Sequence, residues 1–448
     1  MCGFQSVDSK PGRVQGADED LIRRATNLAG RGVRAYARTL KQTSPNARRY
    51  LLSVVLQNVG MGVLGTMFAL YVRAAGMGVS VVGNVEGALA LASGVVCLFI
   101  PPLVAVVGYR VLLVSAALAY GIARLGQAFG MHAASFVALG LLFGVGDGIL
   151  RSVGVAFLSE NSAARDRTLL FTVDFFARVA AMVVGAGIGG LLPTVLGIWL
   201  PELMAFRWTM IVAGALLLLS VVPVIGVREL RRRSGRPWAT YVNAISRFRS
   251  WGRLVRLAVP EAIISFGAGV IMPFVPLFLK VNMGASIAQI GLIQGVASVI
   301  MAVATLSTPL LVRRFGLVGT VVLTEIASLP FLLTIPLTTS LPAVAVVMWA
   351  RSALMNMSWP VYNQLGVEGI PVHDRPLVVG WMSVAWSVAW LGGSVLGGHL
   401  NERSYTVPYF VATALYAVGA VATWVLLKDV KSTTASPPVE SPMVESAV

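Results

Sequence analysis

The sequence has few of the residues that build soluble enzymes and metal sites. Only 12% of its 448 residues are charged, whereas hydrophobic residues make up 56%. An average soluble domain carries roughly 25% charged residues, so this chain is solvated mainly by lipid. Its two cysteines, Cys2 and Cys97, cannot build a disulfide framework, and its three histidines show no metal-ligand spacing. We therefore expect no metal site and no cofactor.

Two further absences concern catalysis and targeting. No glycine-rich run is followed by Lys-Ser or Lys-Thr, so the sequence has no loop for nucleotide phosphates. No apolar segment carries a Ser/Lys, His-rich or paired-Asp arrangement at catalytic spacing, so we expect a protein that is not an enzyme. The first 48 residues are polar and basic, so we expect no cleavable signal peptide and predict that the first membrane segment directs insertion.

What the sequence does contain is a long internal repeat, in which motifs return about 208 positions later. The repeated residues are Gly60-Met61-Gly62-Val63 with Gly267-Ala268-Gly269-Val270; Gly83, Gly87, Pro101 and Gly108 with Gly291, Gly295, Pro309 and Gly316; Asp166-Arg167 with Asp374-Arg375; and Gly185, Gly189 and Gly190 with Gly393, Gly397 and Gly398. Such a repeat in an apolar chain predicts two homologous membrane halves in tandem. Two equivalent halves can rock about a site held between them, which is typical of transporters.

Twelve apolar segments are long enough to cross a bilayer as helices of about 20 residues. They are residues 51–73, 79–101, 110–129, 134–155, 169–192, 207–227, 257–279, 287–309, 317–336, 341–362, 378–400 and 407–427. We therefore predict an all-α integral membrane protein with two pseudo-symmetric halves of six helices each. Its parts are a basic cytoplasmic segment (1–48), a first half (49–227), a cytoplasmic linker with an amphipathic helix (228–256), a second half (257–428) and a disordered cytoplasmic tail (429–448).

The basic residues give the orientation, because cytoplasmic loops carry an excess of Lys and Arg. Placing the N-terminus in the cytoplasm puts most of the 35 Lys and Arg residues inside, and only Arg73, Arg207, Lys280 and Arg403 outside. We predict a multi-pass protein of the cell membrane with both termini in the cytoplasm. The net charge of +16 then reflects topology and affinity for anionic lipid headgroups.

Three peripheral features carry local signals. Residues 20–41 have the pattern of an amphipathic helix, and Ser44-Pro45 predicts an N-cap and first-turn proline for the first span. A basic, aromatic pattern in the linker predicts a helix lying on the membrane surface. Such a stretch is also compatible with RNA contact, but beside twelve spans we expect lipid as its partner and no nucleic acid. The aromatic and apolar residues of this pattern are Trp238, Tyr241, Ile245, Phe248 and Trp251.

The repeat, the spans and the linker together resemble the major facilitator superfamily over residues 48–428. In that family the loop between the second and third spans carries an Asp, an Arg and a Gly; here Gly108 and Arg110 are present and Ala105 occupies the acidic position. The family's drug/proton antiporters carry a Gly-Pro followed by Gly-Gly in the fifth span. Here Gly185, Gly189 and Gly190 match its glycines, and Ala186 occupies the position of the proline. The resemblance implies the twelve-helix fold and alternating access, and it suggests the multidrug or proton-coupled efflux type.

Small residues allow helices to approach closely in lipid. In the family, spans two and eleven and spans five and eight touch between the halves. The small faces of spans two and eight (Gly83, Gly87, Gly291 and Gly295) could therefore line the hinge, together with the glycines of spans five and eleven, and the Asp-Arg loops are candidate gates. The alternative is static packing with no gating role. The candidates are Gly185, Gly189, Gly393, Gly397, Asp166, Arg167, Asp374 and Arg375.

Charged residues within the first-half spans are candidates for proton coupling or a charge network. A charge at bilayer depth costs at least ~2.5–3.5 kcal/mol, so each needs a partner, water or a function. Two Asp-Arg pairs are spaced i, i+4 and share a helix face, and together they could form one four-charge network. They either bind a proton or substrate, or lock a cytoplasmic gate. The candidates are Glu86, Asp147, Arg151, Asp174 and Arg178.

Glu86 differs from the two aspartates because no basic residue lies within one helical turn of it. Its counterpart in the repeat is the uncharged Gln294, which favours a functional role for Glu86. Glu325 and Arg124 lie on spans that are peripheral in the family, and we rank them lower. Glu261 follows a proline at a predicted helix start, where an acid suits the helix dipole, so we interpret it as a cap.

The two halves differ in chemistry. Matching Arg151 with Arg351 pairs Asp147 with the apolar Val347, and tryptophans are concentrated in the second half. These tryptophans either line a substrate cavity or mark a membrane interface, and the polar candidates either line the cavity or bond neighbouring helices. The candidate cavity residues are Gln57, Asn58, Gln294, Asn356, Trp359, Trp386 and Trp390.

These features favour a secondary active transporter that moves a small molecule across the cytoplasmic membrane by alternating access. Without a nucleotide loop the energy comes from a gradient, and carboxylates near arginines favour protons over sodium. An aromatic, apolar cavity suits export of amphipathic compounds. The alternatives are a proton-coupled uptake permease or facilitator for a small metabolite, and a non-transporting sensor or scaffold. We expect a monomer whose partners are its substrate, protons and membrane lipids.

Overall fold

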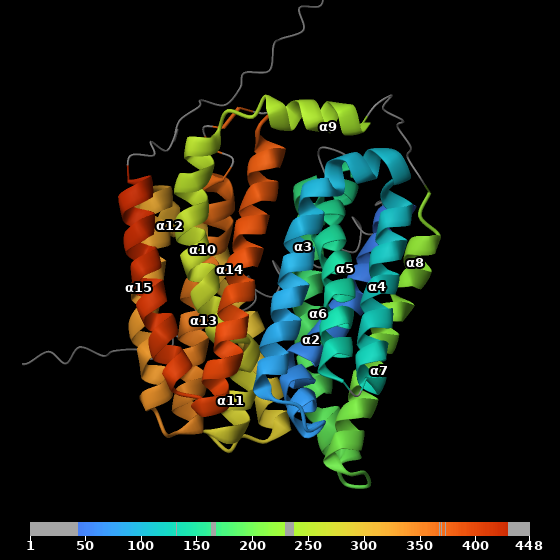
Figure 1. Cartoon of the computed structure of the whole chain (residues 1–448), viewed down its shortest axis with the longest axis vertical. Coiled ribbons are helices and arrows are strands. Elements are labelled where there is room, and N and C mark those ends of the chain that lie inside the picture. Colours follow the sequence, from blue (N-terminus) through green and yellow to red (C-terminus); the bar gives the residue numbers. More distant parts are fainter. Residues whose placement is uncertain are drawn as a thin grey trace, which may run out of the picture.

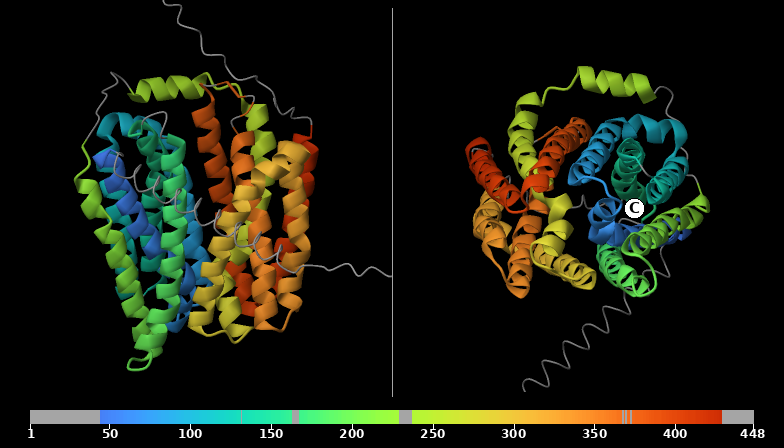
Figure 2. Two further views of the ribbon diagram at one scale, coloured as in Figure 1. Left: turned by 180° about the vertical axis from the view of Figure 1, so that it is seen from behind. Right: turned by 60° about the horizontal axis from the view of Figure 1, so that its bottom comes forward.

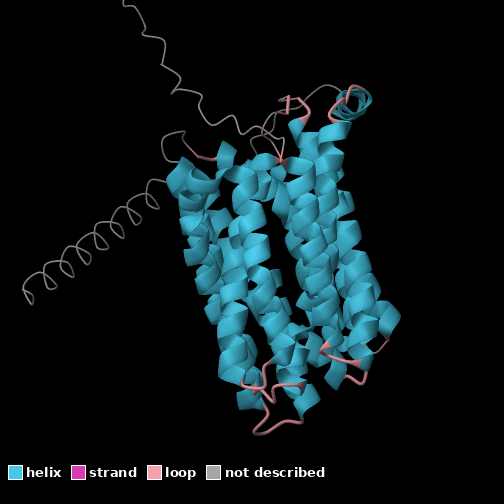
Figure 3. Cartoon of the chain, turned by 90° about the vertical axis from the view of Figure 1, so that its left-hand side faces the viewer, coloured by secondary structure: helices cyan, strands magenta, loops and turns pink. Residues whose placement is uncertain are grey.

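Helices and loops make up the whole described chain, which contains no strand (Figure 3). The computed structural model describes residues 44–130, 132–162, 167–228, 237–366, 368, 370–371 and 373–428. The predicted helix at 20–41, Asp166 and the C-terminal tail lie outside these residues. Within them, the prediction of an all-helical protein is confirmed.

Long helices follow one another with short connections (Figure 1). In chain order they are α2 (Pro45–Ala74), α3 (Val79–Val107), α4 (Tyr109–Phe129), α5 (Ala133–Glu160), α6 (Arg167–Leu196), α7 (Glu202–Leu219), α8 (Val221–Ile225), α9 (Pro237–Ser246), α10 (Trp251–Ile271), α11 (Val275–Val281), α12 (Ile287–Thr334), α13 (Leu341–Leu365), α14 (Arg375–Arg403) and α15 (Val407–Leu427). Two 3-10 turns, η1 (Met272–Phe274) and η2 (Ile335–Leu337), follow α10 and α12.

Local sequence signals set several helix ends. The predicted N-cap Ser44 begins α2, and its hydroxyl accepts a hydrogen bond at 3.2 Å from a backbone amide of the first turn. Ser286 and Gln289 form a reciprocal capping box at the start of α12, which satisfies two amides that the helix itself leaves free. Gly316 breaks α12 into two helical parts at φ 70° and ψ 178°, a conformation that residues with a side chain rarely adopt.

Ten helices among the described residues are long and apolar enough to cross a membrane. Length and hydropathy therefore do not recover all twelve predicted spans. One of the ten, Ile287–Leu337, contains the break at Gly316 and covers two predicted spans. Helix α13 covers a further predicted span but is not among the ten, because Arg351 and several amide side chains lower its hydropathy.

The helices form two groups that lie side by side (Figure 1). The first group comprises α2 to α8 and the second comprises α10 to α15, while α9 lies across one end of the molecule (Figure 2). The groups touch mainly through two helix pairs, α3 with α14 and α6 with α12. The largest buried apolar cluster draws residues from both groups, including Met67 and Phe274. A site between the groups is therefore bordered by these two helix pairs.

Candidate functional site

Asp147 lies within α5 and is only 4% exposed. Its carboxylate accepts hydrogen bonds from the Ser93 hydroxyl of α3 at 2.8 Å and the Tyr120 hydroxyl of α4 at 2.8 Å. The third donor is the Arg151 Nε, at 2.6 Å. Three donors, one of them a neutralising guanidinium, offset the loss of water around this buried carboxylate. Asp147 therefore ties α3, α4 and α5 together, while the Arg151 side chain is 67% exposed.

The second ion pair lies on α6, where the Arg178 Nε is 2.7 Å from Asp174. Arg178 also donates to the Tyr50 hydroxyl of α2 at 2.9 Å. The other oxygen of Asp174 is buried and has no hydrogen-bond partner among the described residues. This carboxylate is therefore less completely satisfied than Asp147. A ligand or conformer that offers a donor can stabilise it further.

The predicted four-charge network is not formed in this conformation. Each arginine pairs with the aspartate on its own helix, and no hydrogen bond or ion pair within the described ranges joins one pair to the other. The reason is geometric: α5 and α6 make few contacts, because α5 packs against α3 and α4 while α6 packs against α2 and α12.

Glu86 on α3 has neither a hydrogen bond nor an ion pair among the described residues, and it is half-buried. The charge with the largest electrostatic effect on it is the guanidinium of Arg124. Arg124 is 3% exposed, donates to the Gln127 side chain at 2.7 Å and lies 4.1 Å from the centre of the Phe143 ring. The arginine is thus held by its own surroundings, and Glu86 is left without a direct partner.

The tryptophans of α13 and α14 form one continuous aromatic group. The Trp359 and Trp386 rings are 5.2 Å apart at an angle of 78°, and the Trp386 and Trp390 rings are 5.9 Å apart at 27°. Trp359 is 46% exposed. Edge-to-face and offset-stacked arrangements of this kind leave ring faces available for an apolar ligand.

The predicted polar cavity residues are mostly engaged within the protein. Gln57 is 5% exposed and donates to the Ser53 hydroxyl at 3.0 Å. In this conformation Gln57 packs within the first group, and its place in the cavity stays a prediction. Asn58 and Asn356 are half-buried, and each donates to a backbone carbonyl one turn earlier on its own helix. Gln294 is half-buried on α12, and its amide oxygen lies near Gly65 of α2.

The predicted hinge glycines of α6 and α14 lie within their own groups. A Cβ atom at Gly185 would clash with the backbone of Val59 in α2, and one at Gly393 would clash with the backbone of Phe266 in α10. Gly189 and Gly397 meet the same two helices. These four glycines therefore do not line the contact between the groups, which corrects the prediction.

The residues that follow two of those glycines, Ala186 after Gly185 and Ser394 after Gly393, do lie at the contact between the groups. A Cβ atom at Gly83 of α3 would clash with the backbone of Ser394 in α14. A Cβ atom at Gly291 of α12 would lie 2.5 Å from the carbonyl oxygen of Ala186 in α6. Because successive helix residues are about 100° apart, neighbouring positions on α6 and α14 face different helices. The sequence shows the small residues but not which helix each one faces.

The Asp-Arg loop of the second group anchors the start of α14. Asp374 is 1% exposed and accepts a hydrogen bond from the Ser250 hydroxyl at 2.5 Å. Arg375 donates to the Ile370 carbonyl at 3.1 Å. In the first group Arg167 donates to the Ser159 carbonyl at 3.2 Å, and Asp166 lies outside the described residues.

Two acidic residues in the second group, Glu261 and Glu325, are buried more deeply within the helices than the sequence predicted. Glu261 does not begin a helix, because α10 already starts at Trp251, and this corrects its interpretation as a cap. Glu325 is 3% exposed. One carboxylate oxygen of each residue is buried without a hydrogen-bond partner among the described residues, and the charge of Glu325 acts on Glu261. The Glu261 error arose because the helix continues through Pro260 from the linker.

Known proteins share this fold. Residues 257–446 match the family model of the Major Facilitator Superfamily. The nucleoside transporter NupG is 15% identical, with a TM-score of 0.67 over 85% of this chain and 99% of that one. A D-xylose–proton symporter is 18% identical, with a TM-score of 0.63 over 85% of this chain and 97% of that one.

A bacterial homologue of the human lysosomal transporter Spinster, in an inward-facing conformation, has a TM-score of 0.66 at 14% identity, over 86% of this chain and 98% of that one. No curated protein sequence matches the chain. The fold of the described chain is therefore that of major facilitator superfamily transporters.

Proposed function

We propose that this protein is a secondary active transporter that moves a small molecule across the cytoplasmic membrane by alternating access. The observation that carries the proposal is a pair of equivalent contacts between the two helix groups. Gly83 packs against Ser394, and Gly291 packs against Ala186. Gly83 and Gly291 are 208 positions apart, and so are Ala186 and Ser394. Equivalent close contacts on both sides of a site are what two rocking halves require.

The same offset supports twelve spans in two homologous halves, with the break at Gly316 dividing α12 into two spans and α13 supplying another. The Tyr120 hydroxyl donates to Asp147 at 2.8 Å. The residues 208 positions later, Ser328 and Met355, are also in contact, with 3.2 Å between Oγ and Sδ. The offset of 208 residues therefore pairs Asp147 with Met355. This replaces the pairing of Asp147 with Val347, which came from matching Arg151 with Arg351.

With this register the proposed site has one charged and one aromatic wall. Arg151 and Arg178 correspond to Trp359 and Trp386, each pair being 208 positions apart. The two arginines carry neutralising aspartates, and the two tryptophans are in ring contact. An amphipathic molecule with a planar apolar part and a polar group suits such a site. This supports the transport, by export, of amphipathic compounds.

Proton coupling is the proposed energy source. Asp147 and Asp174 are paired with arginines, whereas Glu86 has no direct partner, so Glu86 is the first candidate for the coupling carboxylate. Sodium coupling is the alternative. Uptake of a small metabolite is the second candidate function, favoured by the nucleoside and D-xylose–proton transporters that share the fold. A non-transporting sensor is the candidate of a different class.

A ligand screen followed by flux measurement tests the proposed function. Purified protein is screened against a library of amphipathic compounds, nucleosides and sugars, and a ligand is expected to raise the Tm. The compound that raises the Tm most is then loaded into proteoliposomes, with and without a pH gradient. Accumulation that depends on the gradient supports a transporter. Binding without flux in either direction would favour the sensor.

Trp386→Ala tests the aromatic wall. Trp386 is the central ring of the three, so removing it takes away contact area for a planar ligand. We expect the Kd of the identified ligand to rise roughly tenfold, because contact between two aromatic rings contributes up to about 1.5 kcal/mol and a tenfold change in Kd is about 1.4 kcal/mol. Trp424→Ala is the matched control, because Trp424 is 53% exposed on α15 and outside the aromatic group. Equal Kd values for the two variants would place Trp386 in packing.

A further inference from the structure

Helix α9 crosses the line where α3 and α14 meet, at one end of the molecule (Figures 1 and 2). It is part of the linker between the two groups, and the sequence predicted that it lies on the membrane surface. Two of its aromatic residues contact α3. The Tyr241 hydroxyl donates to the Leu98 carbonyl at 2.5 Å, and the Trp238 ring is 6.4 Å from the Phe99 ring. Burial raises the pKa of Tyr241, so its hydroxyl remains a donor.

The residues that follow α9 are fixed to the second group. Phe248 is 6% exposed and belongs to a buried cluster that includes Leu377 of α14. Ser250 donates to the buried Asp374 at 2.5 Å, immediately before α14 begins. The Trp251 and Trp381 rings are 5.9 Å apart. Residues 237–251, which we name the latch segment, therefore contact α3 at one end and α14 at the other.

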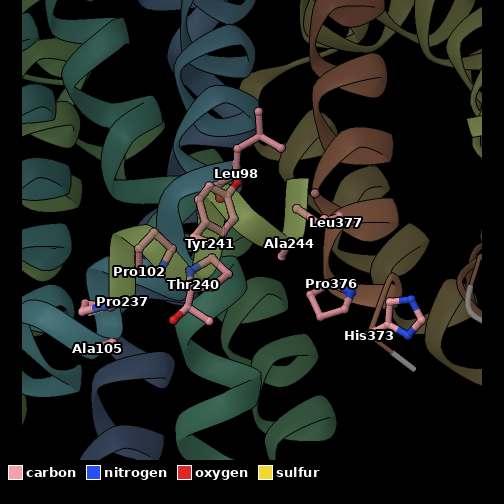
Figure 4. Close-up of a pocket in the computed structure, with 12 residues that line it drawn as sticks. Leu98, Pro102, Ala105, Pro237, Thr240, Tyr241, Ala244, His373, Pro376 and Leu377 are labelled. Atoms are coloured by element: carbon pink, nitrogen blue, oxygen red, sulfur yellow. The ribbon is translucent and has the colours of Figure 1, made fainter. Parts of the chain in front are cut away.

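A cavity of about 270 Å³ lies between the latch segment, α3 and the start of α14 (Figure 4). Its lining is mostly apolar and includes Pro102 of α3, Ala244 of α9 and Leu377 of α14. Because this space is open, α9 is held to α3 by a few specific contacts and not by continuous packing. Such an attachment can be released without disrupting the buried cores of either group.

The α3–α14 contact beneath the latch segment is close. A Cβ atom at Gly380 of α14 would lie 3.1 Å from the Leu98 side chain. Leu98 is also the residue whose carbonyl accepts the Tyr241 hydrogen bond. The latch segment thus bonds to α3 at the position where α3 touches α14, and separation of the two helices at this end would have to stretch or break that attachment.

We propose that the latch segment holds this end of the α3–α14 contact closed, and that release of α9 from α3 regulates opening there. The proposal rests on the proposed function, since alternating access requires the two groups to separate at each end in turn. One net hydrogen bond shifts such an equilibrium by roughly two- to tenfold. The Tyr241–Leu98 bond is therefore strong enough to set the ratio of closed to open states, and weak enough to break.

The test measures the distance between spin labels on α3 and α14. Labels are placed at Val106→Cys and Val379→Cys, which are 42% and 48% exposed, with Cys2 and Cys97 replaced by serine. Tyr241→Phe removes the hydrogen bond while keeping the ring, and it is expected to raise the population at long distance by roughly two- to tenfold. Ala244→Leu fills the cavity with apolar contact and is expected to lower that population.

Val242→Ala is the matched control, because Val242 lies on α9 and is 59% exposed. It is expected to leave the distance distribution unchanged. A Tyr241→Phe distribution identical to that of Val242→Ala would overturn the latch. The measurement needs no substrate, so its outcome is separate from that of the transport assay. If the protein transports substrate but Tyr241→Phe leaves the distance between the labels unchanged, the latch proposal is rejected and the proposed transport function stands. If the distance changes but no substrate is transported, the transport function is rejected, while the contact between α9 and α3 still controls the separation of α3 and α14.

Discussion

Glu86→Gln is expected to abolish accumulation of the substrate against its gradient while leaving counterflow exchange intact. The amide is nearly isosteric with a protonated carboxyl group, so it mimics one state of the proposed cycle and prevents the other. The environment should accept an amide, because the position 208 residues later is Gln294, also half-buried. We therefore expect normal folding and at least a tenfold loss of gradient-driven uptake or export, since coupling is lost outright and not weakened by a single contact.

Proteoliposomes provide the measurement, with the initial rate recorded under an imposed pH gradient and then in equilibrium exchange. The control variant is Glu202→Gln, because Glu202 is an exposed acid at the start of α7. Concentrative transport that survives in Glu86→Gln would remove Glu86 from the coupling mechanism.

Glu325→Gln separates two positions for the coupling carboxylate. Glu325 is 3% exposed in the second part of α12, and one of its carboxylate oxygens has no hydrogen-bond partner within the described chain. If Glu86 alone carries the proton, Glu325→Gln should alter stability but preserve the response to the pH gradient. If Glu325→Gln uncouples transport and Glu86→Gln does not, the coupling site lies among α10, α12 and α13 and not on α3.

The contrast between these carboxylates shows what the sequence could reveal. Each Asp-Arg pair is local, at i, i+4 on one helix, and such spacing is visible in the sequence. The hydroxyls of Ser93 and Tyr120, which complete the site of Asp147, come from two other helices. Nothing in their local pattern distinguishes them from ordinary core residues, so only the tertiary arrangement could identify them.

Helix boundaries show a similar division. The N-cap at Ser44 and the glycine break at Gly316 depend on local chemistry, and the structure places a cap and a break at these residues. The start of α10 depends on how the linker packs, because Phe248 is buried against the second group and lets the helix begin at Trp251. This early start moved Glu261 from a predicted helix end to the interior of the bundle.

The neighbouring helix that each glycine packs against was the least predictable part of the candidate site. A stripe of small residues indicates close packing, but a helix has several neighbours, and a shift of one residue turns the stripe by about 100°. Gly185 therefore faces α2, whereas the next residue, Ala186, faces Gly291 of α12. Gly83 and Gly291 do lie at the contact between the groups, as the family's pairing of spans two and eleven and spans five and eight predicted for the small residues of spans two and eight.

Gly83→Ala is expected to reduce the transport rate at least tenfold with normal insertion into the membrane. Its Cβ atom would collide with the carbonyl oxygen of Ser394, which is backbone and cannot rotate away. The helices must then separate, and the α3–α14 contact that closes one state is lost. Buried overpacking of this type typically costs 1–3 kcal/mol, and a tenfold change in the ratio of two states needs about 1.4 kcal/mol.

The matched control is Gly187→Ala, because a Cβ atom at Gly187 of α6 has nothing within 4 Å. Both variants exchange glycine for alanine inside a long helix, so any gain in helix propensity is shared. The expected difference is therefore due to contact between the groups alone. Rates are measured in proteoliposomes and normalised to the amount of inserted protein. If Gly83→Ala transports as fast as Gly187→Ala, the α3–α14 contact is static packing, and the proposed rocking must use another pair of helices.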